Sequence, residues 1–155
     1  MKTLAYCISF LIVSFCISLN AYSQELTAEQ KEKITSEVAT LFEGSLKASE
    51  SFKVEMLANN VDDSLQAGFI IGGQFFRSFE SVMADFREKI KGAMSQKMNV
   101  VNQKITVLAD NSALVTASGT YSMPLEDGRN LTGSFAWTLV CSKVNGSWKI
   151  IHTHM

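Results

Sequence analysis

The chain has 155 residues, of which 46% are hydrophobic and 19% are charged, and its formal net charge is −1. This length suits one domain with a core of its own. The small negative charge argues against nucleic acid as a main partner, because nucleic-acid-binding proteins carry an excess of basic residues.

Residues 1–23 have the pattern of a secretory signal peptide. Lys2 gives a positive start, the run from Leu4 to Leu19 is almost wholly apolar, and Ala21 and Ser23 are the small residues expected before a cleavage site. The run is short for a membrane span, which needs about 20 apolar residues, so a retained anchor is the less favoured alternative. We therefore expect residues 24–155 to be exported to the periplasm or the medium, with no membrane attachment after cleavage.

Two of the three cysteines, Cys7 and Cys16, lie in this leader. The mature chain would keep only Cys141 and could form no internal disulfide, so its stability must come from core burial. We interpret Cys141 as a small buried strand residue and not as a nucleophile.

The first part of the mature chain predicts two helices. Leu26 to Lys47 has helical spacing of apolar residues, and Thr27 with Gln30 resembles a capping box. A short second helix is expected from Phe52 to Leu57, with Ser51 as its N-cap. The apolar positions of the first helix are Ile34, Val38, Leu41, Phe42 and Leu46.

A hairpin and a third helix follow. Leu65 to Ile71 and Gln74 to Phe76 predict two strands, because Gly72 and Gly73 between them form a strong turn signal. Phe79 to Met94 predicts the third helix, with Ser78 as its N-cap.

The remaining sequence predicts a meander of four strands. They are Met98 to Leu108, Ala113 to Met123, Arg129 to Lys143 and Ser147 to His154. The turns contain Asp110-Asn111, Asp127-Gly128 and Asn145-Gly146, and the last two pairs favour type I′ turns. Three helices and a mostly C-terminal antiparallel sheet of about six strands predict one α+β domain over residues 24–155.

The final strands carry a family resemblance. The segments Ala117–Tyr121, Gly133–Val140 and Gly146–His154 are similar to those of SnoaL-like, DUF4440-type domains of the NTF2-like superfamily, which end in G-x-W-x-I-x-H-x-H. The resemblance implies a cone, in which a curved sheet wraps around three helices and encloses a pocket, and a homodimer formed through the sheet. Members include polyketide cyclases, steroid isomerases, dehydratases and oligomerisation modules. The acid–base residues of the cyclases and isomerases match no motif here.

The last strand holds the candidate catalytic residues. Strict alternation places Trp148, Ile150, His152 and His154 on one face, and Lys149, Ile151 and Thr153 on the other. Two histidines could bind a metal, but no third ligand is evident, so we expect neither a metal nor another cofactor. We favour hydrogen bonding to a neighbouring strand or subunit for His152 and His154. Proton transfer, with Asp62 or Asp63 as the acid, is the alternative.

Four residues are candidates for binding a ligand: Phe69, Arg77, Tyr121 and Trp137. Arg77 could meet an anionic group, and the two aromatic side chains with polar atoms could orient a ligand. We therefore predict an exported domain that binds a small, largely apolar molecule in its cone. The alternatives are an isomerase, cyclase or dehydratase that uses a histidine and an acid, and a non-catalytic dimerisation module.

Overall fold

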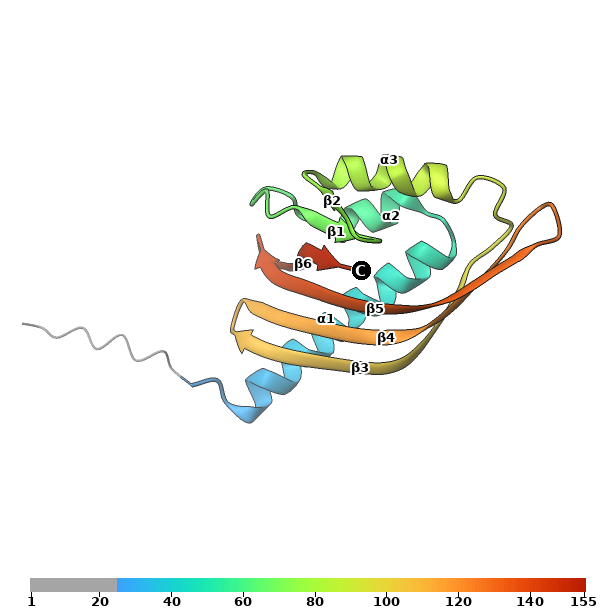
Figure 1. Ribbon diagram of the computed structural model, residues 1–155. Coiled ribbons are helices and arrows are strands. Elements are labelled where there is room, and N and C mark those ends of the chain that lie inside the picture. The colour runs from blue at the N-terminus through green and yellow to red at the C-terminus, as the bar shows by residue number, and fades with distance from the viewer. Residues whose placement is uncertain (1–24) are drawn as a thin grey trace, which may run out of the picture.

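A curved six-stranded sheet wraps around the helices (Figure 1). The computed structural model describes residues 25–155, so the predicted signal peptide lies outside the described residues. The elements are α1 (Ala28–Glu50), α2 (Val54–Asn59), β1 (Phe69–Ile71), β2 (Gln74–Phe76), α3 (Phe79–Lys89), β3 (Lys97–Ala109), β4 (Ser112–Pro124), β5 (Asn130–Val144) and β6 (Ser147–His154). Among the described residues, no helix is both long and apolar enough to cross a membrane.

The strands lie in the order β2-β1-β6-β5-β4-β3. The last four form the predicted antiparallel meander, and β1 and β2 form the predicted hairpin. The β1 and β6 strands pair in parallel, with Phe69 opposite Thr153. A parallel pair needs a long crossover, which here consists of β2, α3 and the meander. The predicted α+β cone of three helices and six strands is confirmed, and this one parallel pair makes the sheet mixed.

Two of the predicted hairpin turns have the expected backbone. Gly72 and Gly73 have φ values of 58° and 77°, and Asn145 and Gly146 have values of 50° and 82°. Both central residues of a type I′ turn need positive φ. The Asp127-Gly128 turn is different, because only its glycine has positive φ.

The Asp127 carboxylate explains that difference. It accepts hydrogen bonds from the backbone N–H of Arg129 at 3.0 Å and from the Arg129 Nε at 2.7 Å. An aspartate that bonds the backbone two residues on stabilises an Asx turn. The loop is also wider, since the N–H of Leu125 bonds to the carbonyl of Arg129. The type I′ prediction was wrong at this position.

Helix α1 begins as its sequence predicts. The Thr27 hydroxyl accepts from the Gln30 N–H at 3.2 Å, and the Gln30 side chain accepts from the Thr27 N–H at 2.8 Å. The assignment of Ser51 as the N-cap of α2 was wrong. Its hydroxyl donates to the Lys47 carbonyl at 2.7 Å and so closes the end of α1, whereas Lys53 precedes α2 and provides no side-chain cap.

Helix α3 has its predicted cap but is shorter than predicted. The Ser78 hydroxyl accepts from the N–H of Ser81 at 3.3 Å. The helix ends at Lys89 and not at Met94. Gly92, with φ of 75°, lets the chain turn away towards β3.

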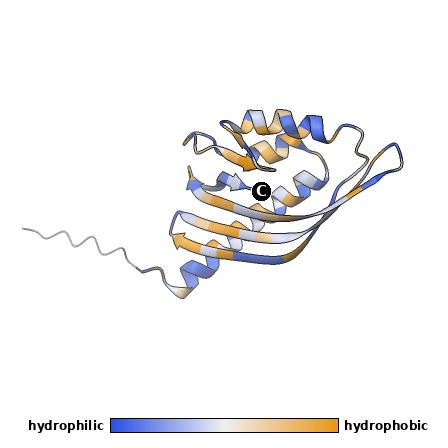
Figure 2. Cartoon of the chain, in the orientation of Figure 1, coloured by the Kyte–Doolittle hydropathy of each residue, from blue (hydrophilic) through white to orange (hydrophobic). Residues whose placement is uncertain are grey.

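The core has two parts that meet inside the cone. The first lies between α1 and the strands β4 to β6, and the second lies between the β1–β2 hairpin and α3. Figure 2 shows stretches of hydrophobic residues on the long strands, and burial alternates along β4 and the second half of β5, as expected for a sheet with one buried face. Cys141 is buried in the first part, and this burial raises the pKa of its thiol to about 12, in agreement with the structural role predicted for it.

A β-bulge interrupts β6. Ile150 pairs with Cys141 and His152 pairs with Val140, so Ile151 has no partner of its own on β5. An extra residue reverses the alternation of every side chain that follows it. Trp148 and Ile150 therefore face the helices before the bulge, and Thr153 faces them after it.

Candidate functional site

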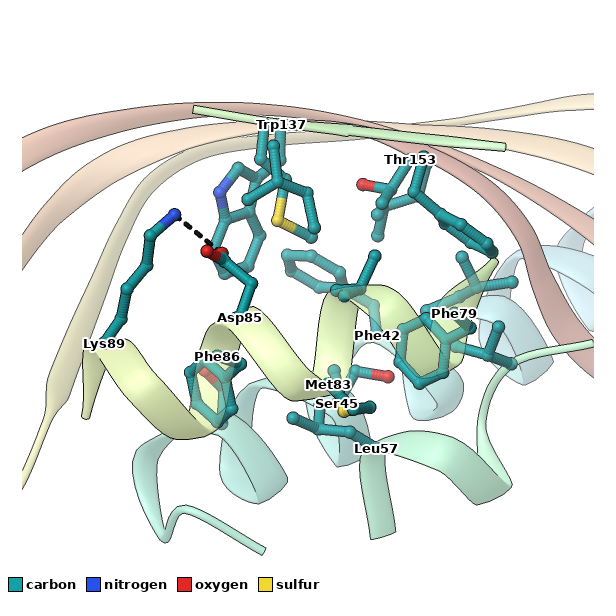
Figure 3. A pocket seen from close by; sticks show the side chains of 18 residues that line it. Phe42, Ser45, Leu57, Phe79, Met83, Asp85, Phe86, Lys89, Trp137 and Thr153 are labelled. Atoms are coloured by element: carbon teal, nitrogen blue, oxygen red, sulfur yellow. Dashed lines mark ion pairs between the residues drawn. The ribbon is translucent and has the colours of Figure 1, made fainter. Parts of the chain in front are cut away.

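A cavity of about 150 Å³ lies between the concave face of the sheet, α1 and α3 (Figure 3). Its wall is largely aliphatic and aromatic. The apolar lining residues are Phe42, Leu57, Val61, Phe69, Ile71, Phe79, Val82, Met83, Phe86, Trp137, Leu139, Ile150 and Met155. An apolar cavity on the order of 150 Å³ can hold a molecule the size of benzene. The site can therefore accept one ring.

The aromatic side chains of the wall support one another. The centroid of the Trp137 ring lies 4.5 Å from that of Phe135 and 6.3 Å from that of Phe42, and the Phe42 contact is edge to face. The rings of Phe69 and Phe79, which also line the cavity, have centroids 5.4 Å apart. Such pairs are worth about 0.5–1.5 kcal/mol beyond their burial, so they hold the wall in a defined shape.

One end of the cavity carries an ion pair. Asp85 and Lys89 lie one turn apart on α3, and the Lys89 Nζ is 2.7 Å from the Asp85 Oδ2. In Figure 3 the pair lies on the side of Trp137, away from Thr153. The Asp85 and Lys89 side chains are 26% and 55% exposed, so this end of the cavity reaches solvent.

The two serines of the lining are already hydrogen-bonded. The Ser45 hydroxyl donates to the Leu41 carbonyl at 2.9 Å and accepts from the Asn60 amide at 3.1 Å. The Ser49 hydroxyl accepts from the Gln96 amide at 3.1 Å. The Ser45 hydroxyl therefore both donates and accepts, whereas the Ser49 hydroxyl accepts one bond.

Thr153 is different. Its side chain lines the other end of the cavity, the residue is only 3% exposed, and its Oγ1 is buried with no hydrogen-bond partner among residues 25–155. Its neighbours across the sheet are Phe69 and Leu139, which are apolar and fully buried. A buried hydroxyl without a partner costs about 1–3 kcal/mol.

The bulge also decides where the histidines lie. His152 and His154 face the outside of the sheet, opposite to Trp148 and Ile150, so the prediction that these four share a face was wrong. The Nδ1 of His152 is 2.8 Å from the Gly68 carbonyl, so this N–H donates to the loop before β1. This bond is of the kind expected for a structural histidine. His154 is exposed.

The two predicted acids, Asp62 and Asp63, also lie outside the cavity lining. The Asp62 carboxylate accepts hydrogen bonds from the hydroxyl and the backbone N–H of Ser64, and these bonds lower its pKa. Asp63 accepts from the N–H of Phe79 at 2.8 Å and so anchors the start of α3. The structure therefore does not bring His152, His154 and Asp62 together around the cavity.

Of the four predicted ligand-binding residues, Phe69 and Trp137 line the cavity. Arg77 is exposed just before α3. The Tyr121 ring packs against Gly133, where any side chain would clash with it, and it lies away from the cavity lining.

Sequence reasoning missed the polar residues of the cavity. Asp85 lies between Val82 and Phe86 on the apolar face of α3, and this interruption was a usable signal. Thr153 could not be found by periodicity, because the bulge that turns it inward depends on pairing with β5. Among residues 25–155 no cluster of three or more histidine, cysteine or acidic side chains could hold a metal ion.

Comparison with known proteins agrees with this architecture. A model of the SnoaL-like domain matches residues 38–155. The chain belongs to the SnoaL-like domain family. No curated protein matches the chain.

Solved structures show the same fold at low identity. A nuclear transport factor 2 (NTF2-like) superfamily protein from Salmonella enterica has a TM-score of 0.71 at 15% identity, over 79% of this chain and 89% of that one. A proposed scytalone dehydratase from Novosphingobium aromaticivorans has a TM-score of 0.74 at 10% identity, over 83% and 86%. The association domain of C. elegans CaMKII has a TM-score of 0.66 at 14% identity, over 81% and 97%.

Proposed function

We propose that this SnoaL-like domain binds a small, largely apolar molecule in the cavity between α1, α3 and the sheet. The observation that carries the proposal is a cavity of about 150 Å³ with an apolar wall that the side chains leave unfilled. Pockets of this kind, mostly apolar with a few placed polar groups, are typical of small-molecule sites. The ion pair of Asp85 and Lys89 marks the end through which a ligand would enter.

Native mass spectrometry of the protein, purified gently from its own host, tests the proposal. We expect extra mass that disappears on denaturation. Leu57→Phe should abolish the extra mass, because Leu57 lines the cavity and a larger ring would occupy it. Leu65→Phe is the matched control, since Leu65 is 65% exposed and does not line the cavity. Equal ligand retention by both variants would refute the assignment to this cavity.

A second candidate is an isomerase, cyclase or dehydratase that works by proton transfer. It is supported by the resemblance in fold to a proposed scytalone dehydratase and by a carboxylate, that of Asp85, in the cavity wall. Under this proposal Asp85→Asn would stop turnover. His152→Asn or His154→Asn would stop it only if a histidine takes part from outside the cavity, as the sequence alternative requires. Unchanged turnover in all three variants would remove the proposal.

The outer face of the sheet supports a homodimer as a further proposal. Leu114 and Val140 lie side by side on this face, and Phe75 at its edge is 60% exposed. The similarity to a domain named for association points the same way. Light scattering after size exclusion should give a dimer that Val140→Lys converts to a monomer, because a buried unpaired charge is costly. A dimer that survives this change would exclude this face.

Export is proposed from the leader sequence. Mass spectrometry of the N-terminal peptide of the protein from its host should give a peptide that begins at Gln24 if residues 1–23 are a cleaved signal peptide. An N-terminus at Met1 would refute it.

A further inference from the structure

One polar side chain of the cavity lining is buried and makes no hydrogen bond with the described residues. The hydroxyls of Ser45 and Ser49 have partners in the protein, and the Asp85 carboxylate is paired with Lys89. The Oγ1 of Thr153 has no hydrogen-bond partner among the described residues, although the residue is only 3% exposed. A buried polar atom without a partner in the protein is a candidate point of contact for a ligand.

A water molecule is a poor partner for this hydroxyl. A buried water needs two to four polar contacts to be stable. The strand neighbours of Thr153 on the cavity side are Phe69 and Leu139, and neither offers a polar side-chain atom. An organic molecule that presents one polar atom and fills the remaining space with apolar atoms suits this end of the cavity better.

The chemistry of the hydroxyl limits what that polar atom can be. A threonine hydroxyl donates one hydrogen bond and accepts others, so it can pair with a carbonyl or with another hydroxyl. A carboxylate or an ammonium group would be buried without a counter-charge, because the only ion pair of the lining lies at the opposite end in Figure 3. The partner group is therefore uncharged.

We propose that the cavity selects ring-sized, uncharged molecules that carry one hydroxyl or carbonyl oxygen, and that the Thr153 Oγ1 recognises this oxygen. The inference rests on the proposed binding function and adds the class of ligand and the residue that selects it. Phenols and small aryl ketones are members of this class. The ring would lie between the wall formed by Phe42 and Trp137 and that formed by Phe69 and Phe79.

Phenol and toluene provide the test, because they differ only by a hydroxyl in place of a methyl group, as threonine and valine do. Dissociation constants for both are measured by isothermal titration calorimetry on the refolded, ligand-free protein and on Thr153→Val. The preference for phenol over toluene should fall by about 2- to 10-fold in the variant, which corresponds to the loss of one hydrogen bond. Thr116→Val, the same change on the exposed outer face, should leave the preference unchanged.

The outcomes separate the inference from the proposed function. If both compounds bind and Thr153→Val leaves their ratio unchanged, the role of Thr153 is refuted while the cavity stands as a binding site. If neither compound binds, the binding function itself fails at this size of ligand, and the inference falls with it. Thr153→Ser keeps the hydroxyl and Thr153→Ala removes it, so this pair repeats the comparison if the valine variant does not fold.

Discussion

Replacing Thr153 by valine should stabilise the ligand-free protein. The two side chains have nearly the same shape, so the change replaces a hydroxyl by a methyl group without creating a cavity. In the folded protein the hydroxyl is buried against Phe69 and Leu139 with no hydrogen bond, whereas in the unfolded chain it bonds to water. The desolvation of an unpaired hydroxyl costs about 1–3 kcal/mol, and valine avoids this cost.

We expect the free energy of unfolding to rise by about 1–2 kcal/mol. This is the lower part of the range, because the hydroxyl of the parent protein can rotate to its least unfavourable orientation. For a domain of this size the increase corresponds to a rise in Tm of roughly 3–8 °C. Urea unfolding followed by circular dichroism measures it, with the slope m unchanged because the same surface is exposed. Thr116→Val on the outer face is the control and should lie within about 0.5 kcal/mol of the parent protein.

The protein must be unfolded and refolded before the measurement. A retained ligand would stabilise the parent protein by mass action and could reverse the sign of the difference. If the ligand-free Thr153→Val protein is less stable than its parent by 1 kcal/mol or more, the Thr153 hydroxyl has a favourable partner. The reasoning from an unsatisfied hydroxyl would then be refuted.

Three further results are expected. The Trp148 indole N–H donates to the Glu37 carboxylate at 2.7 Å and lowers the pKa of that carboxyl group. The bond therefore stabilises the fold fully above pH 4.5, the ordinary pKa, and this stabilisation is lost as the pH falls through the lowered pKa. Glu37→Gln should flatten the dependence of Tm on pH below 4.5, and an unchanged slope would contradict this. Gly73→Ala should lower the free energy of unfolding by about 1 kcal/mol because φ at Gly73 is 77°. Gly44→Ala within α1 should instead raise it by about 0.5–1 kcal/mol. Urea unfolding measures both, and equal effects would refute the backbone argument. In a protein of residues 24–155, whose one cysteine is Cys141, the thiol with its pKa of about 12 should not react with Ellman's reagent until urea unfolds the chain, and rapid labelling of this native protein would show an open core.

Local signals account for the parts of the fold that could be predicted. The capping box at Thr27, the cap at Ser78 and the Gly72-Gly73 turn depend only on residues a few positions apart, and each was confirmed. Two errors arose where a second local hydrogen bond was formed in place of the predicted one. Ser51 bonds back to α1, and Asp127 binds Arg129 and changes the turn type.

The site was harder to predict than the fold for a different reason, because it depends on elements that are distant in sequence. Phe69 and Trp137, two of the predicted ligand-binding residues, line the cavity, and their binding of a ligand stays a prediction. Asp85 and Thr153 were missed, because a polar residue on an apolar face is usually interpreted as an exception to the pattern. Which polar residues face inward depends on the register between strands that are distant in sequence, and alternation within one strand does not contain that information.

The bulge at Ile151 divides β6 into two halves in which opposite sets of alternating residues face the pocket. The first half follows the rule that even-numbered residues point inward, and the second half follows the reverse rule. A relative with the same terminal motif but without the extra residue in its pairing would present two imidazoles to its pocket, where this chain presents a hydroxyl and a methionine. One terminal sequence can therefore encode two pocket chemistries, an acid–base one and a neutral hydrogen-bonding one, and the pairing of a single residue selects between them.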